Sequence, residues 1–385
     1  MKNSLFIISE FVDAETNSTG YYWSGIIKGL AKKIDLISVI STKDSIDKST
    51  FDEKIKVISI NASIFGLKFK LFKPLAALWD SIALTKKLLN AAKKNDIVLF
   101  GTNPIFLPPL IAFFCRIKQI KTIHIIHDLF PENIISISKK GNVFFRFLIQ
   151  PFYKNARRNF DCLICIGKDM EERLLENKTS HQDIKYIPNW VAEPKSLPIG
   201  KLEKNKTPFI FQYFGNIGKF QDAKILIEAI ALIDNEEILF QFIGGGNALS
   251  DLKKLSVEKN IKNISFISQT SFKNRNDVFA IADISIVTLA DEMIGCAVPS
   301  KAYFSISAGK KIFVIGNYKS ELSLLIQKTP TLGWVHSGSN SIELANKFKE
   351  IYLHKNNSFN IKESEKLIFE STAIDMYYAI IEKHL

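Results

Sequence analysis

The sequence predicts an α/β protein made of two doubly wound parallel-sheet domains. Short apolar runs alternate with longer segments of helical periodicity, and this alternation occurs twice along the 385 residues. Strands that alternate with helices form a parallel sheet covered on both faces. The two halves are separated by residues 195–208, a stretch rich in proline and lysine that predicts a linker.

The predicted domain boundaries follow from this alternation. A first domain spans residues 1–194, a second spans residues 209–360, and an amphipathic helix in residues 361–385 can return to the first domain. Strands of the first domain are expected at Leu5–Ser9, Leu36–Ser41, Lys56–Ile60, Ile97–Gly101, Thr122–His127, Cys162–Ile166 and Lys185–Ile187. Strands of the second are expected in FIFQYFGN, ILFQFIGGG, NISFIS, ADISIVTL and KKIFVIG. Ligands of such sheets bind beyond the carboxyl ends of the strands, so the chemistry is expected there, in an interdomain cleft.

The positive charge is concentrated in the first half of the chain. The formal net charge is +12, and residues 1–200 carry 29 Lys and Arg against 19 Asp and Glu. Such asymmetry suits an anionic partner, such as a membrane surface or a polyprenyl diphosphate. Two stretches, from Phe65 and from Lys139, mix aromatic and basic residues as interfacial segments do, although amphipathic helices covering a sheet have the same pattern. No nucleic-acid reading motif is found, so no nucleic-acid partner is expected.

No apolar run predicts secretion or a membrane span. The run after Met1 stops at Ser9 and Glu10, and Ile105–Cys115 contains two prolines and is far shorter than the ~20 residues that a spanning helix requires. Four scattered cysteines predict no disulfide framework. The expected location is cytoplasmic, peripheral at the inner face of the cell membrane.

Two strand ends in the second domain predict ligand-binding turns, the first for a diphosphate and the second for a base or ribose. Glycine lets the backbone approach a diphosphate, and the helix that follows offers unpaired amides and a favourable dipole. The candidates in the first turn are Gly215, Asn216, Gly218, Lys219 and Gln221. The candidates in the second turn are Gly244, Gly245, Gly246 and Asn247. Three consecutive glycines carry an entropic cost that favours close approach of a ligand.

Further candidates lie at the start of a later helix and in the first domain. Pro299 takes a first-turn position, which places Ser300 and Lys301 where an anion would bind. His127 and Asp128 end a strand and can exchange a proton or bind a sugar hydroxyl. The polar loop from Glu10, ending at Thr19 and Gly20, and the nearby Glu132 are candidates for an acceptor or phosphate loop.

In order, these segments resemble glycosyltransferase family 4, especially members that build bacterial surface polysaccharides and lipid-linked glycans. The motifs are Gly20, HDLFPE, YIPNWV, FGNIGKFQ, IGGGN, and AVPSK followed by SAG. The resemblance implies a GT-B fold of two Rossmann-like domains and a configuration-retaining transfer without metal or cofactor. It places a nucleotide sugar in the second domain and a glycan or polyprenyl-diphosphate-linked acceptor in the first. Lys219 and Lys301 would neutralise the departing diphosphate, while His127 and Asp128 would orient the transferred sugar.

The chain departs from the family pattern at four positions. Where the broad family has an Arg and a Lys in the turn after the linker, this chain has Asn216 and Gln221, which leaves Lys219 as the substitute. Many members carry paired glutamates near the donor sugar, and Cys296 and Phe304 stand at those places here. Neither can accept a hydrogen bond as a carboxylate does, although Asp291 and Glu292 lie just upstream. Two alternatives stay open. A sugar-nucleotide epimerase shares this two-domain architecture, and the missing glutamates favour a degenerate transferase that acts as a binding partner in polysaccharide assembly.

Overall fold

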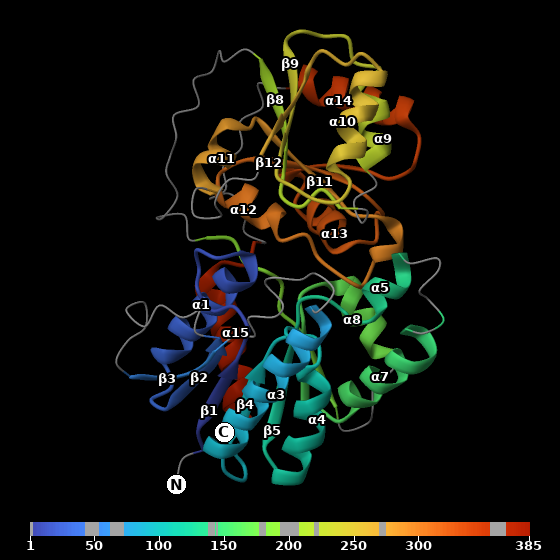
Figure 1. Cartoon of the computed structure of the whole chain (residues 1–385). Coiled ribbons are helices and arrows are strands. Elements are labelled where there is room, and N and C mark those ends of the chain that lie inside the picture. The colour runs from blue at the N-terminus through green and yellow to red at the C-terminus, as the bar shows by residue number, and fades with distance from the viewer. Residues whose placement is uncertain are drawn as a thin grey trace. The chain divides into compact units, whose positions relative to one another are not determined.

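The computed structural model forms two compact units (Figure 1). It describes residues 3–42, 54–61, 73–137, 143, 145–176, 182–192, 208–218, 223–268, 275–354 and 367–385. The first unit comprises Met1–Asn189, Gly295–Val298 and Glu370–Leu385, and the second comprises Trp190–Ile294 and Pro299–Phe369. The first unit thus includes a short segment, Gly295–Val298, from the middle of the second predicted domain. Of the predicted linker, all but Pro208 lies outside the described residues.

The first unit contains a seven-stranded parallel sheet. The strand order is β3-β2-β1-β4-β5-β6-β7. The strands are β1 Leu5–Ile8, β2 Ile37–Thr42, β3 Ile55–Ile60, β4 Ile97–Phe100, β5 Lys121–Ile126, β6 Cys162–Cys165 and β7 Asp183–Tyr186. Every residue of β1, β4 and β6 is buried, because helices cover both faces of the sheet. The predicted fold class is confirmed in this half of the chain.

The helices of the first unit divide between the two faces of its sheet. They are α1 Ser18–Ala31, α3 Lys73–Ala91, α4 Leu107–Lys118, α5 Glu132–Ile137, the π-helical turn η4 Phe145–Ile149, α7 Gln150–Arg158, α8 Lys168–Leu175 and α15 Glu370–Glu382. Strand order reverses direction at β1, so right-handed crossovers place α1 on one face and α3, α4 and α7 on the other. None of the helices in the described ranges is long and apolar enough to span a bilayer.

The C-terminal helix α15 packs against α1. The contact is close because α1 has a glycine at the crossing: a Cβ on Gly29 would lie 2.6 Å from Cγ2 of Ile374. The apolar face of α15 buries Ala373, Ile374 and Tyr377, while Asp375 pairs with Lys33 at the surface. The last helix is therefore an integral part of the first unit.

The second unit contains a six-stranded parallel sheet in the order β10-β9-β8-β11-β12-β13. The strands are β8 Phe209–Phe214, β9 Ile238–Ile243, β10 Ile264–Ile267, β11 Ile284–Thr288, β12 Lys311–Ile315 and β13 Gly333–His336. The helices are α9 Ala223–Ile230, α10 Leu249–Glu258, α11 Arg275–Ile281, the 3-10 turns η8 Asp291–Met293 and η9 Pro330–Leu332, α12 Lys301–Ser307, α13 Glu321–Lys328 and α14 Ser341–Leu353. Five strands are confirmed; β13 is not predicted, because GWVH is short and begins with glycine.

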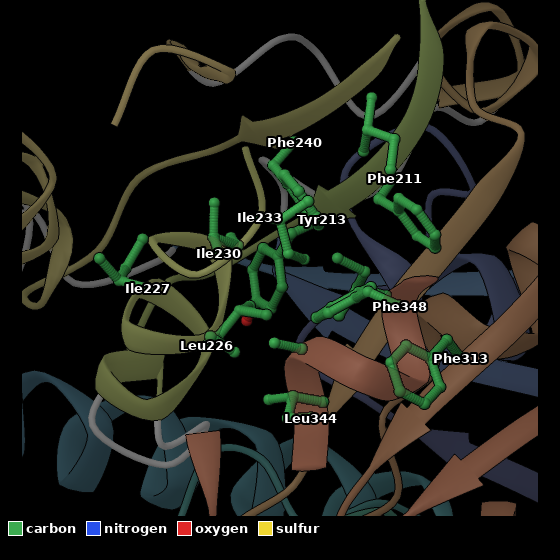
Figure 2. Close-up of a cluster of buried hydrophobic side chains, with 14 of the residues drawn as sticks. Phe211, Tyr213, Leu226, Ile227, Ile230, Ile233, Phe240, Phe313, Leu344 and Phe348 are labelled. Atoms are coloured by element: carbon green, nitrogen blue, oxygen red, sulfur yellow. The ribbon is translucent and has the colours of Figure 1, made fainter. Parts of the chain in front are cut away.

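An aromatic cluster forms the core of the second unit (Figure 2). Phe211 of β8 and Phe240 of β9 stack with ring centroids 5.3 Å apart. Phe348 of α14 meets both rings edge-on, at 4.9 and 5.0 Å, and also contacts Phe313 of β12. Edge-to-face pairs of this kind add stability beyond the area that they bury. This cluster holds β8 and β9 rigidly, and the two glycine turns extend directly from those strands.

Candidate active site

The turns after β8 and β9 lie against each other and explain the glycines there. The amide of Ile217 donates to the carbonyl of Gly245 at 2.7 Å. A Cβ on Gly244 would lie 2.0 Å from the Gly215 carbonyl oxygen, and a Cβ on Gly246 would lie 2.3 Å from that of Ile217. Both glycines also have positive φ, +141° and +146°. Contact between two backbone turns therefore requires glycine at both positions, and their predicted contact with a ligand stays a prediction.

Lys301 brings a cation to the first of these turns. It is the first residue of α12, its Nζ lies 3.6 Å from the centroid of the Tyr213 ring, and its Cδ lies 3.9 Å from the place of a Cβ on Gly215. Desolvation lowers the pKa of this ammonium to about 7. Within the described ranges it takes part in no ion pair. A desolvated cation held over an aromatic face at a strand end is suited to receive an anion.

Other candidates for donor binding are hydrogen-bonded within the protein, exposed, or outside the described residues. The amides of Ala302 and Tyr303 donate to the carbonyls of Pro299 and Ser300, so these first-turn amides are already engaged. Asn247 is exposed, and Asn216 accepts a 3.0 Å hydrogen bond from the Tyr213 hydroxyl through its carbonyl. Lys219 and Gln221 lie outside the described residues. Sequence reasoning missed Tyr213, because an aromatic residue inside an apolar strand gives no functional signal.

His127 and Asp128 follow β5 at the carboxyl edge of the first sheet. Burial lowers the pKa of His127 to about 4, so its imidazole is neutral near pH 7 and acts through hydrogen bonds rather than charge. Its ring lies 6.1 Å from that of Trp23 on α1. Desolvation raises the pKa of the Asp128 carboxyl to about 6, although more than a third of the residue is accessible to solvent. Accessibility leaves Asp128 able to meet a ligand.

The loop after β1 is folded tightly onto the start of α1. Asn17 caps the helix by accepting a 2.9 Å hydrogen bond from the Gly20 amide. A Cβ on Gly20 would lie 2.1 Å from the Asp13 carbonyl oxygen, so glycine is needed for this close approach. At the base of the loop, burial and the nearby Asp80 raise the pKa of Glu10 to about 7. Sequence reasoning missed Asp80, which lies inside α3.

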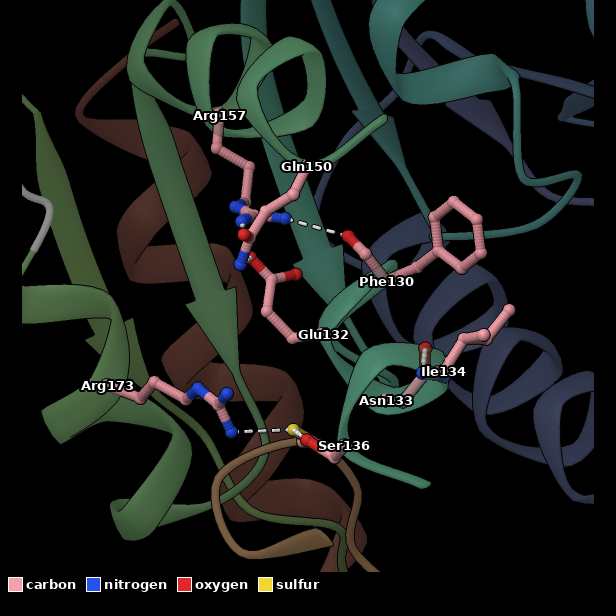
Figure 3. A network of polar contacts seen from close by, with 9 residues as sticks. Phe130, Glu132, Asn133, Ile134, Ser136, Gln150, Arg157 and Arg173 are labelled. Carbon is pink, nitrogen blue, oxygen red and sulfur yellow. Dashed lines mark hydrogen bonds and ion pairs between the residues drawn. The ribbon is translucent and has the colours of Figure 1, made fainter. Parts of the chain in front are cut away.

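The Glu132 carboxylate is bound by other side chains of the first unit (Figure 3). Its carboxylate forms a buried ion pair with Arg157 of α7 and accepts a long hydrogen bond from Gln150 at 3.4 Å. The same guanidinium donates to the carbonyl of Phe130 at 2.8 Å. Of the three residues predicted for an acceptor or phosphate loop, Glu132 thus serves to hold the HDLFPE turn in place, while Thr19 and Gly20 lie in the first turn of α1.

The segment Gly295–Val298 is attached to the HDLFPE turn. Asp128 and Ala297 form an antiparallel bridge, and the Leu129 amide donates to the Cys296 carbonyl at 2.7 Å. Nη1 of Arg173 donates a hydrogen bond to the Cys296 sulfur at 2.7 Å, drawn as a dashed line from Arg173 in Figure 3. Burial raises the pKa of this thiol. Phe304 is buried in α12. The two residues at the places of the family's glutamates are thus packed inside the protein and supply no carboxylate.

Two doubly wound parallel-sheet units, one with a desolvated lysine beside a glycine turn, are the architecture of the GT-B fold. Family models give the activity class: residues 23–193 match "Glycosyltransferase Family 4" and residues 198–363 match "Glycosyl transferases group 1". The chain is 31% identical over 365 residues to a protein of Pseudomonas aeruginosa named "Probable glycosyltransferase WbjE", covering 90% of this chain and 89% of that one. The chain therefore belongs to glycosyltransferase family 4 and is a glycosyltransferase of the group 1 type.

More distant relatives agree with this assignment. A protein of Escherichia coli named "Putative colanic acid biosynthesis glycosyl transferase WcaI" is 20% identical over 251 residues, covering 62% of this chain and 61% of that one. Among solved structures, HepE of Anabaena, in complex with UDP and glucose, superposes with a TM-score of 0.70 at 15% identity over the full length of both chains. At that identity the likeness shows the fold alone, and it confirms the GT-B prediction.

Proposed function

We propose that this glycosyltransferase moves a sugar, with retention of configuration, from a nucleoside diphosphate donor to a lipid-linked or surface-polysaccharide glycan. In this proposal the second unit binds the nucleotide, the first binds the acceptor, and no metal or cofactor is needed. The reaction takes place at the inner face of the cell membrane. The name of the colanic acid relative supports a role in polysaccharide assembly.

The environment of Lys301 is the observation that carries the donor assignment. Desolvation lowers the pKa of this lysine to about 7, and strongly perturbed groups of this kind are concentrated at functional sites. Its position beside Tyr213 and the Gly215 turn allows its ammonium to stabilise the negative charge of a bound diphosphate. As the bond to the sugar breaks, charge accumulates on that diphosphate, and the ammonium stabilises it.

In the first unit we assign His127 and Asp128 to the transferred sugar. A neutral imidazole and an accessible carboxyl can each hold a sugar hydroxyl by hydrogen bonds. Neither is proposed as a nucleophile. The acceptor's proton passes to an oxygen of the leaving diphosphate, so the protein's task is to position the groups and to stabilise charge.

Thermal unfolding with a panel of nucleoside diphosphates tests the donor site, because a ligand that binds the folded state raises the midpoint. We expect a shift with at least one diphosphate, in buffer containing a chelator, and loss of that shift in Lys301→Ala. Lys224→Ala, an exposed lysine on α9 of the same unit, is the matched control and keeps the shift. If the folded protein shows no shift with any member of the panel, the donor assignment is wrong.

Product analysis separates transfer from epimerisation. With the sugar nucleotide identified by the panel, a transferase releases the nucleoside diphosphate and glycosylates an acceptor, with the anomeric configuration retained. An epimerase instead converts the donor with no acceptor and releases no diphosphate. A product of inverted configuration would contradict the retaining mechanism while leaving the transferase class in place.

A further inference from the structure

Three helices of the first unit and the turn η4 expose neighbouring large apolar side chains. Helix α4 packs against both α3 and α7, and Figure 1 shows the three side by side in front of the sheet. We call their outer side, together with that of η4, the apolar helix face. Its exposed members are Leu75, Leu78, Trp79, Ile82, Phe113, Phe114, Ile117, Phe147, Leu148 and Phe152. Isolated apolar residues are ordinary on a surface, but neighbouring ones on three adjoining helices mark an interaction site.

Helix α3 shows that its role in covering the sheet does not explain the apolar residues on this face. A helix that only covers a sheet turns its apolar side inward and its polar side to water. In α3, Asp80, Ser81 and Thr85 are buried, whereas Trp79 is 64% exposed and Ile82 is 47% exposed. The hydroxyls of Ser81 and Thr85 are satisfied by carbonyls of their own helix. Although Leu84 and Leu88 pack inward, the first half of α3 thus turns Trp79 and Ile82 to its outer side while polar side chains are buried.

The charges on the apolar helix face have one sign. The three helices and η4 contain a single acidic residue, Asp80, which is buried. Their basic residues outside the Arg157–Glu132 pair are Lys73, Lys86, Lys87, Arg116, Lys118, Arg146, Lys154 and Arg158. Aromatic and aliphatic side chains interspersed with lysine and arginine suit a bilayer, where rings enter at headgroup depth and cations meet lipid phosphates. A second copy of the chain would present the same cations, and like charges would oppose that contact.

We propose that the apolar helix face docks on the surface of an anionic phospholipid bilayer. The sequence had indicated the stretches from Phe65 and Lys139; the structure adds α4 between α3 and α7 and makes one surface of them. The inference deepens the proposed function, in which a lipid-linked acceptor lies at such a surface. Vesicle binding nevertheless needs no sugar nucleotide, so the two can fail separately.

Co-sedimentation of the full chain with vesicles tests the proposal. We expect binding to vesicles that contain phosphatidylglycerol, little binding to pure phosphatidylcholine, and weakening as salt screens the attraction. The triple variant Trp79→Glu, Phe113→Glu, Phe147→Glu should partition at least about tenfold less, because each change removes apolar contact and adds repulsion. The matched control is Val257→Glu with Leu353→Glu, which are 79% and 77% exposed on the second unit. It should bind as the unmodified chain does.

Tryptophan fluorescence locates the contact. The chain has four tryptophans, of which Trp23 and Trp190 are buried and Trp334 is half-buried. Lipids brominated in the upper acyl chain should therefore quench chiefly Trp79. In Trp79→Phe most of the quenching should disappear while vesicle binding is kept.

Three outcomes overturn the proposal: no binding to anionic vesicles, undiminished binding by the triple variant, or a lipid-independent dimer that the triple variant abolishes. The last would assign the face to a second copy of the chain. Because the variant positions are exposed, thermal unfolding should show the variants folded. A nucleoside diphosphate shift that persists without vesicle binding would overturn this inference alone and leave the donor site standing.

Discussion

At the scale of the residue, Lys301 makes donor binding depend on pH. Its free pKa of about 7 means that part of the population must take up a proton to meet the diphosphate as a cation. Affinity should therefore fall as pH rises from 7 to 9, by up to about tenfold per unit until the raised pKa of the complex is passed. The diphosphate is already ionised in this range, since phosphate pKa values lie near 6.

Calorimetric titration in two buffers of different ionisation enthalpy measures the proton uptake. In Lys301→Met the affinity should be much weaker, and the binding that remains at high ligand concentration should show no proton uptake and little dependence on pH. An equally steep dependence in Lys301→Met would show that another group titrates.

The glycine turns give a second prediction at this scale. In Gly244→Ala the new Cβ would meet the Gly215 carbonyl at 2.0 Å with φ at +141°, so one of the turns must move. We expect a loss of about 3 kcal/mol or more in unfolding free energy, together with loss of nucleotide binding. Gly309→Ala is the control, because its φ is +71° but nothing lies within 4 Å of the new Cβ. It should cost only about 1 kcal/mol. Equal costs in urea unfolding would contradict the contact.

At the scale of the element, the Glu132–Arg157 pair attaches α5 to α7. Both side chains are buried, so removing one leaves the other charge without compensation. Glu132→Gln should lower the unfolding free energy by about 3–5 kcal/mol in chemical denaturation. Glu171→Gln breaks the partly exposed Lys168–Glu171 pair of α8 and should cost less than about 1 kcal/mol. If Glu132→Gln is nearly as stable as the unmodified chain and loses only activity, Glu132 belongs to the site after all.

At the scale of the whole molecule, hydrogen exchange can show which unit receives the nucleotide. A bound nucleoside diphosphate should slow exchange at the amides of residues 213–218, 243–248 and 300–304, all in the second unit. The strands of the seven-stranded sheet should exchange as they do without ligand. Protection confined to the first unit would reverse the assignment of donor and acceptor.

Much of the fold could be predicted because its signals are local. Short continuous apolar runs such as Leu5–Ile8 and Cys162–Cys165 are typical of strands that are buried on both faces of a sheet. The missed strand β13 lacks such a signal, because it is four residues long and begins with Gly333. The candidate site was predictable as a set of strand ends and glycine turns, since parallel strands bring their carboxyl ends to one edge.

The sequence by itself determined two parallel sheets, the membership in a transferase family and Lys301 as a candidate cation, because periodicity and motif order are properties of neighbouring residues. Only the tertiary structure decided what each side chain meets. It showed that Gly244 faces a carbonyl of another turn, that Glu132 forms an ion pair with Arg157, and that Trp79 is exposed on the outer side of α3. Those outcomes depend on contacts between residues distant in the chain, and a linear pattern does not specify which distant partner or which side of a helix is buried.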